Sequence, residues 1–223
     1  MIRFINLTKS FPTPQGRKVV IDNLSLTLPS GKALGLLGRN GAGKSTMMSI
    51  LSGTLHPDSG RIVSDGSISW PVGLGAALHP EMSGAQNVRF IARIYGVDGD
   101  SLCRFVEDFA ELGAHYHMKL RTYSSGMKAR LAFGASMGIP FDTYLIDETT
   151  AVGDASFRDK SLRLFRHRMK RSGAIMVNHN LRELQEFCDA GLVLEQGKAH
   201  YFDNIADAVA LHQANLARDS RPG

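Results

Sequence analysis

The sequence predicts an α/β fold in which buried strands alternate with helices. Short continuous apolar runs at residues 33–37, 144–146, 174–177 and 192–194 are typical of strands covered on both faces. Helix-like stretches at 44–51 and 157–171 come between these runs. The 223 residues, 43% of them hydrophobic, suffice for a real core. We expect one domain over residues 1–223.

The remaining elements are predicted from periodicity. Residues 2–7, 19–21 and 24–28 are predicted strands, and the alternation in the last of these indicates a sheet with one solvated face. Residues 81–120 have helical spacing, and the apolar run at 131–139, stopped by Pro140, indicates a buried helix. We therefore expect a helical subdomain at about 81–138 and a short C-terminal helical segment at about 204–218.

Composition narrows the class of protein. The net charge of +5 suits phosphate, nucleic acid or an anionic membrane surface, and does not choose among them. Cys103 and Cys188 lack the spacing of a disulfide framework or zinc site, so we expect reduced thiols. No stretch approaches the ~20 apolar residues of a membrane helix, and the start lacks a signal peptide. We expect a cytoplasmic chain that meets membranes through a partner.

A phosphate-binding loop follows the buried run at 33–37. It fits G-x-x-x-x-G-K-[ST] between a strand and a helix, which makes a chance glycine loop the weaker interpretation. Lys44 is expected to reach the β- and γ-phosphates, and the Ser45 hydroxyl to ligate Mg²⁺. The nucleotide-binding segment is predicted to comprise Gly38, Arg39, Asn40, Gly41, Ala42, Gly43, Lys44, Ser45 and Thr46.

Two acids and a histidine follow later buried strands. Asp147 is predicted to hold Mg²⁺, and Glu148 to act as general base on an attacking water. The alternative, a solvated strand end, is disfavoured by the phosphate loop. His179 ends another strand, where α/β proteins place ligands; a lone histidine there is usually structural, and only the set makes it a γ-phosphate sensor.

These motifs occur in a characteristic order with residues 123–127 and 151–154. On that order the chain resembles an ABC-transporter ATPase subunit over roughly residues 2–200. The segments 7–11, 68–71, 123–127 and 151–154 are most similar to the capsular-polysaccharide export ATPases. The resemblance implies a P-loop ATPase fold with an antiparallel β subdomain and a helical subdomain.

The resemblance also implies further roles. Phe11 would stack on adenine, although a core phenylalanine is the alternative. In this family the segment Ser124, Ser125, Gly126 and Met127 faces the γ-phosphate held by another subunit, so two chains would sandwich two ATP molecules. Asp154 would lie at the dimer seam.

The chain departs from the common family pattern at three places. Ser125 and Met127 replace glycine and glutamine, as in the polysaccharide-export branch. The glutamine that usually contacts the metal and the membrane partner in this family is replaced by His79, a candidate metal ligand, with Gln86 nearby. Thr149 replaces a proline, which should alter the turn and leave the acids.

The leading hypothesis is an ATPase that drives export of a capsular, lipid-linked polysaccharide. The membrane subunit would dock near residues 70–87 and make most contacts with the polysaccharide, at the cytoplasmic face of the inner membrane. The alternative for the apolar residues of this segment, such as Val72, is that they belong to the hydrophobic core and do not contact a partner. O-antigen or teichoic acid export is the nearest alternative.

Two other classes are less favoured. A soluble ABC ATPase acting on nucleic acid or ribosomes would use the basic stretch 163–171, but no aromatic residues interleave with its charges after Phe165, so a solvated helix is preferred and no nucleic-acid partner is expected. A P-loop kinase is not expected to carry the 123–127 segment.

Overall fold

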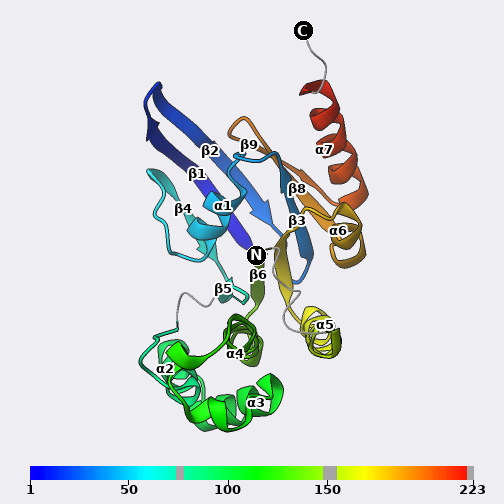
Figure 1. The fold of residues 1–223 in the computed structure, drawn as a ribbon. Helices are drawn as coiled ribbons and strands as arrows, with labels where there is room; N and C mark the ends of the chain where they lie inside the picture. Colours follow the sequence, from blue (N-terminus) through cyan, green and yellow to red (C-terminus); the bar gives the residue numbers. More distant parts are fainter. Residues whose placement is uncertain (74–77, 148–154, 220–223) are drawn as a thin grey trace. The chain divides into compact units, whose positions relative to one another are not determined.

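The computed structural model describes residues 1–73, 78–147 and 155–219, and for residues 155 and 219 the backbone alone. Glu148, Thr149 and Asp154 therefore lie outside the described residues. The chain divides into two compact units (Figure 1). We call residues 1–69, 142–148 and 171–223 the core unit, and residues 70–141 and 149–170 the helical unit.

An antiparallel sheet opens the core unit, with strand order β2-β1-β4. Its strands are β1 (Ile2–Thr13), β2 (Gly16–Leu28) and β4 (Ser59–Ser64). The two strands predicted at 19–21 and 24–28 are one strand in the structure; its pairing with β1 continues across an irregularity between Ile21 and Leu24, where Asn23 has a φ of 44°. Ile2, Phe4 and Leu7 point inward on β1 while intervening residues are more exposed, which confirms the solvated face.

A six-stranded sheet forms the centre of the core unit, in the order β5-β6-β7-β3-β8-β9. Strands β6, β7, β3 and β8 are parallel neighbours and β9 is antiparallel. Strands β3 and β7 are buried at every residue, as continuous apolar runs predict. The bounds are β3 (Ala33–Gly38), β5 (Ile68–Pro71), β6 (Thr143–Asp147), β7 (Gly173–Val177), β8 (Ala190–Glu195) and β9 (Lys198–Phe202).

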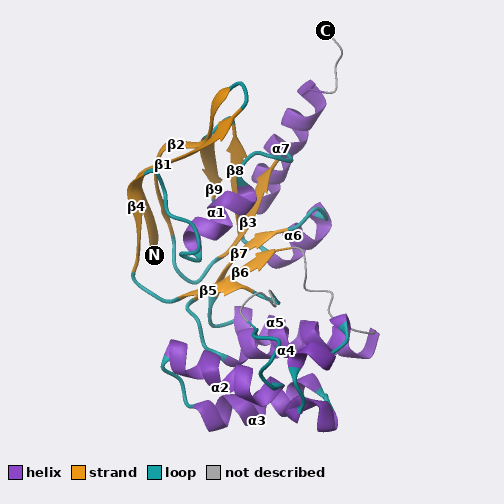
Figure 2. Cartoon of the chain, turned by 60° about the vertical axis from the view of Figure 1, so that its left-hand side comes forward, coloured by secondary structure: helices purple, strands orange, loops and turns teal. Residues whose placement is uncertain are grey.

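Three helices cover this sheet: α1 (Lys44–Leu51), α6 (Leu181–Phe187) and α7 (Ile205–Asp219). Met47, Met48 and Leu51 of α1 share one apolar core with residues of both sheets, so α1 lies between them (Figure 2). Helices α6 and α7 pack on the other face, where a Cβ added at Gly35 would lie 2.7 Å from Ile205 Cδ1.

The helical unit contains α2 (Gly84–Tyr95), α3 (Gly99–Ala110), α4 (Ser125–Gly138) and α5 (Ala155–Met169), with 3-10 turns at Gly113–His117 and Leu120–Thr122. Ser83 and Asp98 cap α2 and α3, each accepting a backbone N–H of the first turn. The Phe109 ring packs 5.7 Å from Phe133 of α4 and 5.2 Å from Phe157 of α5.

Helix α5 extends this unit beyond the helical subdomain expected at about 81–138. Besides the ring contact of Phe157, Lys160 Nζ donates hydrogen bonds to the carbonyl oxygens of Asp108 (3.2 Å) and Phe109 (3.0 Å). These carbonyls end α3, where a cation also meets the negative end of the helix dipole. Sequence periodicity reports each helix separately, so it did not assign α5 to the bundle.

Both cysteines are free and buried, as expected of reduced thiols. Burial raises the pKa of the Cys188 thiol to about 12, which keeps it protonated and unreactive. Within the described ranges, no helix has both the length and the apolar character needed to cross a membrane.

Candidate nucleotide site

Glycine backbone geometry shapes the loop between β3 and α1. Gly38, Gly41 and Gly43 have φ values of 152°, 78° and 107°, a region that side chains rarely adopt. A Cβ at Gly43 would also lie 2.4 Å from Val20 Cγ1 of β2. The loop therefore keeps its curvature, and its closeness to β2, because these positions lack side chains.

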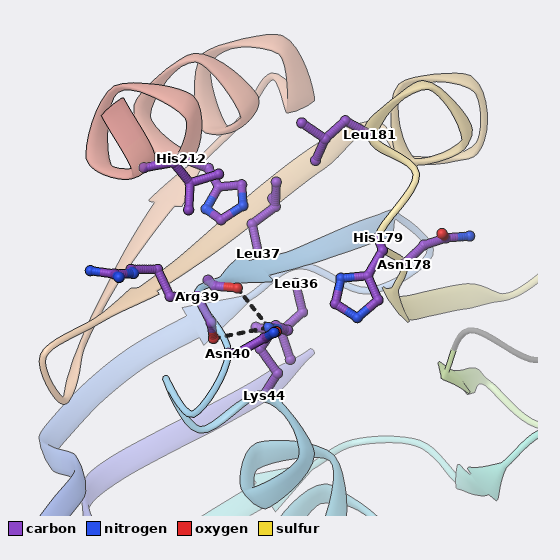
Figure 3. A pocket seen from close by; sticks show the side chains of 11 residues that line it. Leu36, Leu37, Arg39, Asn40, Lys44, Asn178, His179, Leu181 and His212 are labelled. Carbon is purple, nitrogen blue, oxygen red and sulfur yellow. Dashed lines mark hydrogen bonds between the residues drawn. The ribbon is translucent and has the colours of Figure 1, made fainter. Parts of the chain in front are cut away.

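The Lys44 side chain is hydrogen-bonded to the backbone of this loop. Its Nζ donates hydrogen bonds to the carbonyl oxygens of Gly38, at 2.6 Å, and Arg39, at 3.1 Å (Figure 3). Gly43, the N-cap of α1, offers no side chain to the first turn of the helix. A cation and the positive end of a helix dipole thus meet in one loop, which is an anion-binding arrangement.

A cavity of about 410 Å³ opens beside this loop. Three parts of the core unit form it: the end of β3 with the loop, the segment after β7, and helix α7. Figure 3 shows the His179 ring and the Lys44 side chain within the same cavity. The lining residues are Leu36, Leu37, Gly38, Arg39, Asn40, Lys44, Asn178, His179, Leu181, His212 and Leu216.

The His179 backbone is fixed by its neighbours. Asn178 Oδ1 accepts the Asn180 N–H at 2.8 Å, and Asn178 Nδ2 donates to Glu183 Oε2 at 2.7 Å. Asn180 in turn caps α6 by accepting the Arg182 N–H. Hydrogen bonds therefore hold the turn on both sides of His179, and the His179 side chain lines the cavity.

Asp147 lies at the same edge of the sheet. It ends β6 opposite Val177 of β7, and the pairing of Met176 with Gly35 carries this register on to β3. Asp147 is half-buried, whereas Ser45 on the first turn of α1 is exposed. The three strand ends that sequence analysis selected thus share one edge; Glu148, next in the chain, lies outside the described residues.

Phe11 lies on the surface of β1, with 36% of its area exposed, so the alternative of a core phenylalanine is wrong. Its cross-strand partner is Lys18, whose Nζ donates a 3.4 Å hydrogen bond to the carbonyl oxygen of Gly41. Lys9 Nζ lies 5.4 Å from the centre of the Phe11 ring. Phe11 is therefore an exposed ring one strand from the phosphate loop.

The 124–127 segment belongs to the helical unit. Ser124 caps α4, its Oγ accepting the Met127 N–H at 3.2 Å, while Ser125 is exposed. A cavity of about 600 Å³ is lined by Ser124, Gly126 and Met127 together with Glu111, Leu112, His115 and Arg130. A Cβ at Gly126 would find Ser124 Oγ at 3.9 Å as its nearest neighbour, so local packing does not require a glycine there.

His79 is exposed, and hydrogen bonds to nearby residues hold it in place. Its Nδ1 accepts the Glu81 N–H at 3.3 Å, and its backbone N–H donates to Asn87 Oδ1 at 2.7 Å. The first bond puts the ring proton on Nε2, so metal ligation through Nε2 would need the other tautomer. Gln86 is the N3 residue of the α2 capping box, accepting the Ser83 N–H at 2.8 Å.

Sequence reasoning missed His212 and Leu216 of α7, which line the nucleotide cavity. A helix was predicted for this segment, but no part of the nucleotide site was assigned to it. No local motif marks these residues, because a helix that folds back over a loop some 170 positions earlier leaves no spacing signal.

Comparison with known proteins agrees with this geometry. A family model described as "ABC transporter" matches residues 21–151. The polysialic acid transport ATP-binding protein KpsT of Escherichia coli is 46% identical over 94% of this chain and 95% of its own length. The capsule polysaccharide export ATP-binding protein CtrD of Neisseria meningitidis serogroup B is 43% identical over 93% and 96%. An O-antigen export ATP-binding protein of Klebsiella pneumoniae is 32% identical over 94% and 87%.

The fold recurs in solved structures. A dimeric ATP-binding cassette in a post-hydrolysis state, bound to ADP and Pi, has a TM-score of 0.73 and 19% identity, covering 90% of this chain and 98% of that one. The resemblance predicted a P-loop ATPase fold with an antiparallel β subdomain and a helical subdomain, and the structure has these parts. The matched family model, together with relatives aligned over nearly the whole chain, confirms that this protein belongs to the ABC transporter family of ATP-binding subunits.

Proposed function

We propose that this chain is the ATP-hydrolysing subunit of an exporter that moves capsular, lipid-linked polysaccharide across the cytoplasmic membrane. The observation that carries the ATPase role is the shared cavity of Lys44, the phosphate loop and His179. The choice of cargo is supported by relatives named for polysialic acid and capsule polysaccharide, at 43–46% identity. The relative named for O-antigen export is more distant, at 32%.

The nucleotide is held by the core unit. Backbone N–H groups of the loop and first turn of α1 would receive the phosphates, and Lys44 would exchange its two carbonyl contacts for phosphate oxygens. The exposed ring of Phe11 offers a stacking face for adenine. Its cross-strand partner Lys18, on β2, donates a hydrogen bond to the Gly41 carbonyl oxygen of the phosphate loop.

The donors near the loop fit Mg²⁺. Ser45 and Asp147 supply a hydroxyl and a carboxylate oxygen, the hard ligands that this ion prefers. When bound, the ion would neutralise charge on the β- and γ-phosphates. Ser45 and Asp147 are preferred to His79 as Mg²⁺ ligands, because His79 Nδ1 already accepts the Glu81 N–H.

Hydrolysis needs a base and a group that senses the γ-phosphate. Glu148 follows Asp147 directly and would accept a proton from the attacking water. His179, braced by the Asn178 and Asn180 contacts, would donate to the γ-phosphate from the opposite wall. Positioning and charge stabilisation would supply most of the acceleration, as in other phosphoryl transfers.

We propose a head-to-tail homodimer for the active state. Ser124, Ser125, Gly126 and Met127 at the N-terminus of α4 would face the γ-phosphate held by the second copy, with Asp154 at the seam. The open space at Gly126 supports this role, because a glycine that neither packing nor a positive φ requires suits close approach by a ligand.

The membrane subunit would dock near residues 70–87, at the cytoplasmic face of the membrane, and would make most contacts with the polysaccharide. Within this segment Val72 is buried, and Trp70 packs 4.7 Å from Tyr95 and 5.4 Å from Phe141, so both hold the segment in place. Among the described residues of this segment, His79, Pro80, Glu81 and Gln86 are exposed, and we propose them for docking. We propose no nucleic-acid partner.

Glu148→Gln tests the reaction. The substitution removes the base and preserves size, so we expect ATP binding to persist while steady-state phosphate release falls by about 10²–10⁴-fold. Unchanged turnover by the purified variant would refute the assignment. Purifying a tagged chain from membranes tests the cargo: a polytopic polysaccharide-export subunit is the expected companion, whereas ribosomes or DNA would overturn the transport role.

A further inference from the structure

Helix α7 supplies a wall of the nucleotide cavity. Its His212 lines the 410 Å³ cavity together with Lys44 and His179. Figure 3 shows the His212 ring reaching down from α7 on one side of the cavity and His179 on the other. A second cavity, of about 500 Å³, shares Arg39, Asn40 and His212 with the first. His212 therefore lies where both cavities meet the phosphate loop.

The position of His212 is set by close packing. A Cβ at Gly191 of β8 would lie 2.2 Å from Ala208 Cβ, so the bare backbone lets α7 approach the sheet. Farther along α7, Asn215 is 4% exposed and its Nδ2 donates to Glu195 Oε2 of β8 at 2.6 Å. His212 lies on α7 between these two anchors, which fix the part of the helix that carries it.

The charges around His212 are mostly positive. Lys44 and Arg39 line the first cavity, and Lys18, Arg218 and Glu195 line the second with Arg39. The carboxylate of Glu195 is engaged by Asn215. Burial, and next the charge of Lys44, lower the pKa of His212, so its imidazole is neutral near pH 7 without nucleotide.

We propose that His212 is a further ATP-binding residue, which takes up a proton from solvent when ATP binds and then donates a hydrogen bond to a phosphate oxygen. The proposal rests on ATP occupying the phosphate loop. Phosphate charge would offset Lys44 and favour the imidazolium, which forms a charge-assisted hydrogen bond. The proton returns to solvent when the nucleotide leaves.

Proton uptake makes ATP affinity depend on pH. Because the bound state has the higher His212 pKa, affinity rises as pH falls through that value and levels off below the lowered pKa of the free protein. A difference of one pKa unit between the two states corresponds to about a tenfold gain in affinity. The gain develops as pH falls from the His212 pKa of the bound state to that of the free protein, which lies below 6.5, the ordinary histidine value.

The experiment is a titration of the full chain with a non-hydrolysable ATP analogue and Mg²⁺ between about pH 5 and pH 8. It compares wild type with His212→Gln and with His200→Gln, a control histidine exposed on β9. Protonation of the analogue is the same in all three titrations. We expect the affinity of wild type and His200→Gln to rise more toward low pH than that of His212→Gln, by up to about tenfold for each unit by which the analogue raises the His212 pKa.

Histidine NMR gives a second readout on the folded wild-type chain, with the His212 signal identified as the one missing from His212→Gln. We expect its pKa to rise when the analogue is added. Equal pH dependence of binding in wild type and His212→Gln, or a His212 pKa unchanged by nucleotide, would overturn the proposal. Failure of the wild type to bind the analogue at any pH would instead refute the proposed function.

Discussion

At the scale of single residues, glycines in the site serve two different purposes. Gly43 is required by the fold, because φ is 107° and a Cβ would lie 2.4 Å from Val20 Cγ1. Gly126 has ordinary backbone geometry and open space around it. Gly43 is needed for the backbone conformation of the loop. Gly126 leaves open space at the protein surface, where we propose that the nucleotide bound by a second copy lies.

Gly126→Ala is expected to fold normally and to lose ATPase activity by at least tenfold, because the added methyl group meets a ligand rather than the protein. Gly84→Ala is the contrasting variant: its Cβ would lie 2.5 Å from Tyr123 Oη and 2.9 Å from the Tyr116 carbonyl oxygen. It should lower the unfolding free energy by about 1–3 kcal/mol. Thermal denaturation and phosphate release distinguish the two; a Gly126→Ala chain with full turnover would contradict the interface role.

Lys44→Ala removes the cation of the loop. We expect ATP affinity to fall about tenfold to a hundredfold, the usual range for losing a hydrogen bond to a charged group. Lys32→Ala is the control, since Lys32 Nζ lies 3.5 Å from the exposed Asp203 and Lys32 lines neither cavity beside the phosphate loop. Isothermal titration measures both variants, and undiminished affinity of Lys44→Ala would exclude the phosphate contact.

At the scale of elements, an ionic cluster joins the turn before β4 to β1, the strand that carries Phe11. Asp58 accepts hydrogen bonds from Lys9 Nζ (2.8 Å), Ser10 Oγ (2.7 Å) and the Ser10 N–H (2.8 Å). Arg17 of β2 adds a bond to Ser10 Oγ at 2.7 Å. The hydrogen bond from Lys9, followed by those from Ser10, holds the pKa of Asp58 well below its ordinary value. Ionised Asp58 thus fixes the strand beside the phosphate loop.

This cluster predicts acid sensitivity. A lowered folded-state pKa contributes stability above the unfolded value of about 3.9, and that contribution is lost as pH falls toward the folded value. Wild type should therefore lose more stability between pH 7 and pH 3 than Asp58→Asn, which lacks the titrating group. Urea denaturation across this range measures the difference, and parallel pH profiles would show that Asp58 contributes nothing.

At the scale of the whole molecule, the proposed site is divided between units. Lys44, Asp147 and His179 belong to the core unit, whereas Ser124 to Met127 begin α4 of the helical unit. A head-to-tail dimer would complete each site with the 124–127 segment of the second copy. The division predicts that two defective chains with complementary lesions restore activity when mixed.

Complementation tests this division with Ser125→Arg and Glu148→Gln chains. Ser125 is preferred to Ser124, because Ser124 Oγ caps α4 and its loss would destabilise the helix. Each variant alone should be inactive. A mixed dimer contains one intact site, so turnover should return to at most half of the wild-type rate per dimer. No recovery, with mixed dimers confirmed by size and tag, would contradict sites shared between chains.

The sequence by itself determined the local elements and the chemistry of the nucleotide loop. Lys44 to Leu51 form the predicted helix, and the buried strands lie where continuous apolar runs occur, because backbone preference and burial leave a pattern within a few neighbouring residues. The phosphate loop was predictable for the same reason: spacing and residue type within nine positions, 38–46, specify it.

Only the tertiary structure decided what lies opposite that loop. It merged two predicted strands into β2, exposed Phe11, attached α5 to the helical bundle and brought His212 into the nucleotide cavity. Each of these depends on partners distant in the chain, such as Lys160 with the end of α3 or α7 with Gly191. Packing between distant segments has no fixed sequence spacing, so it is settled only when the chain folds.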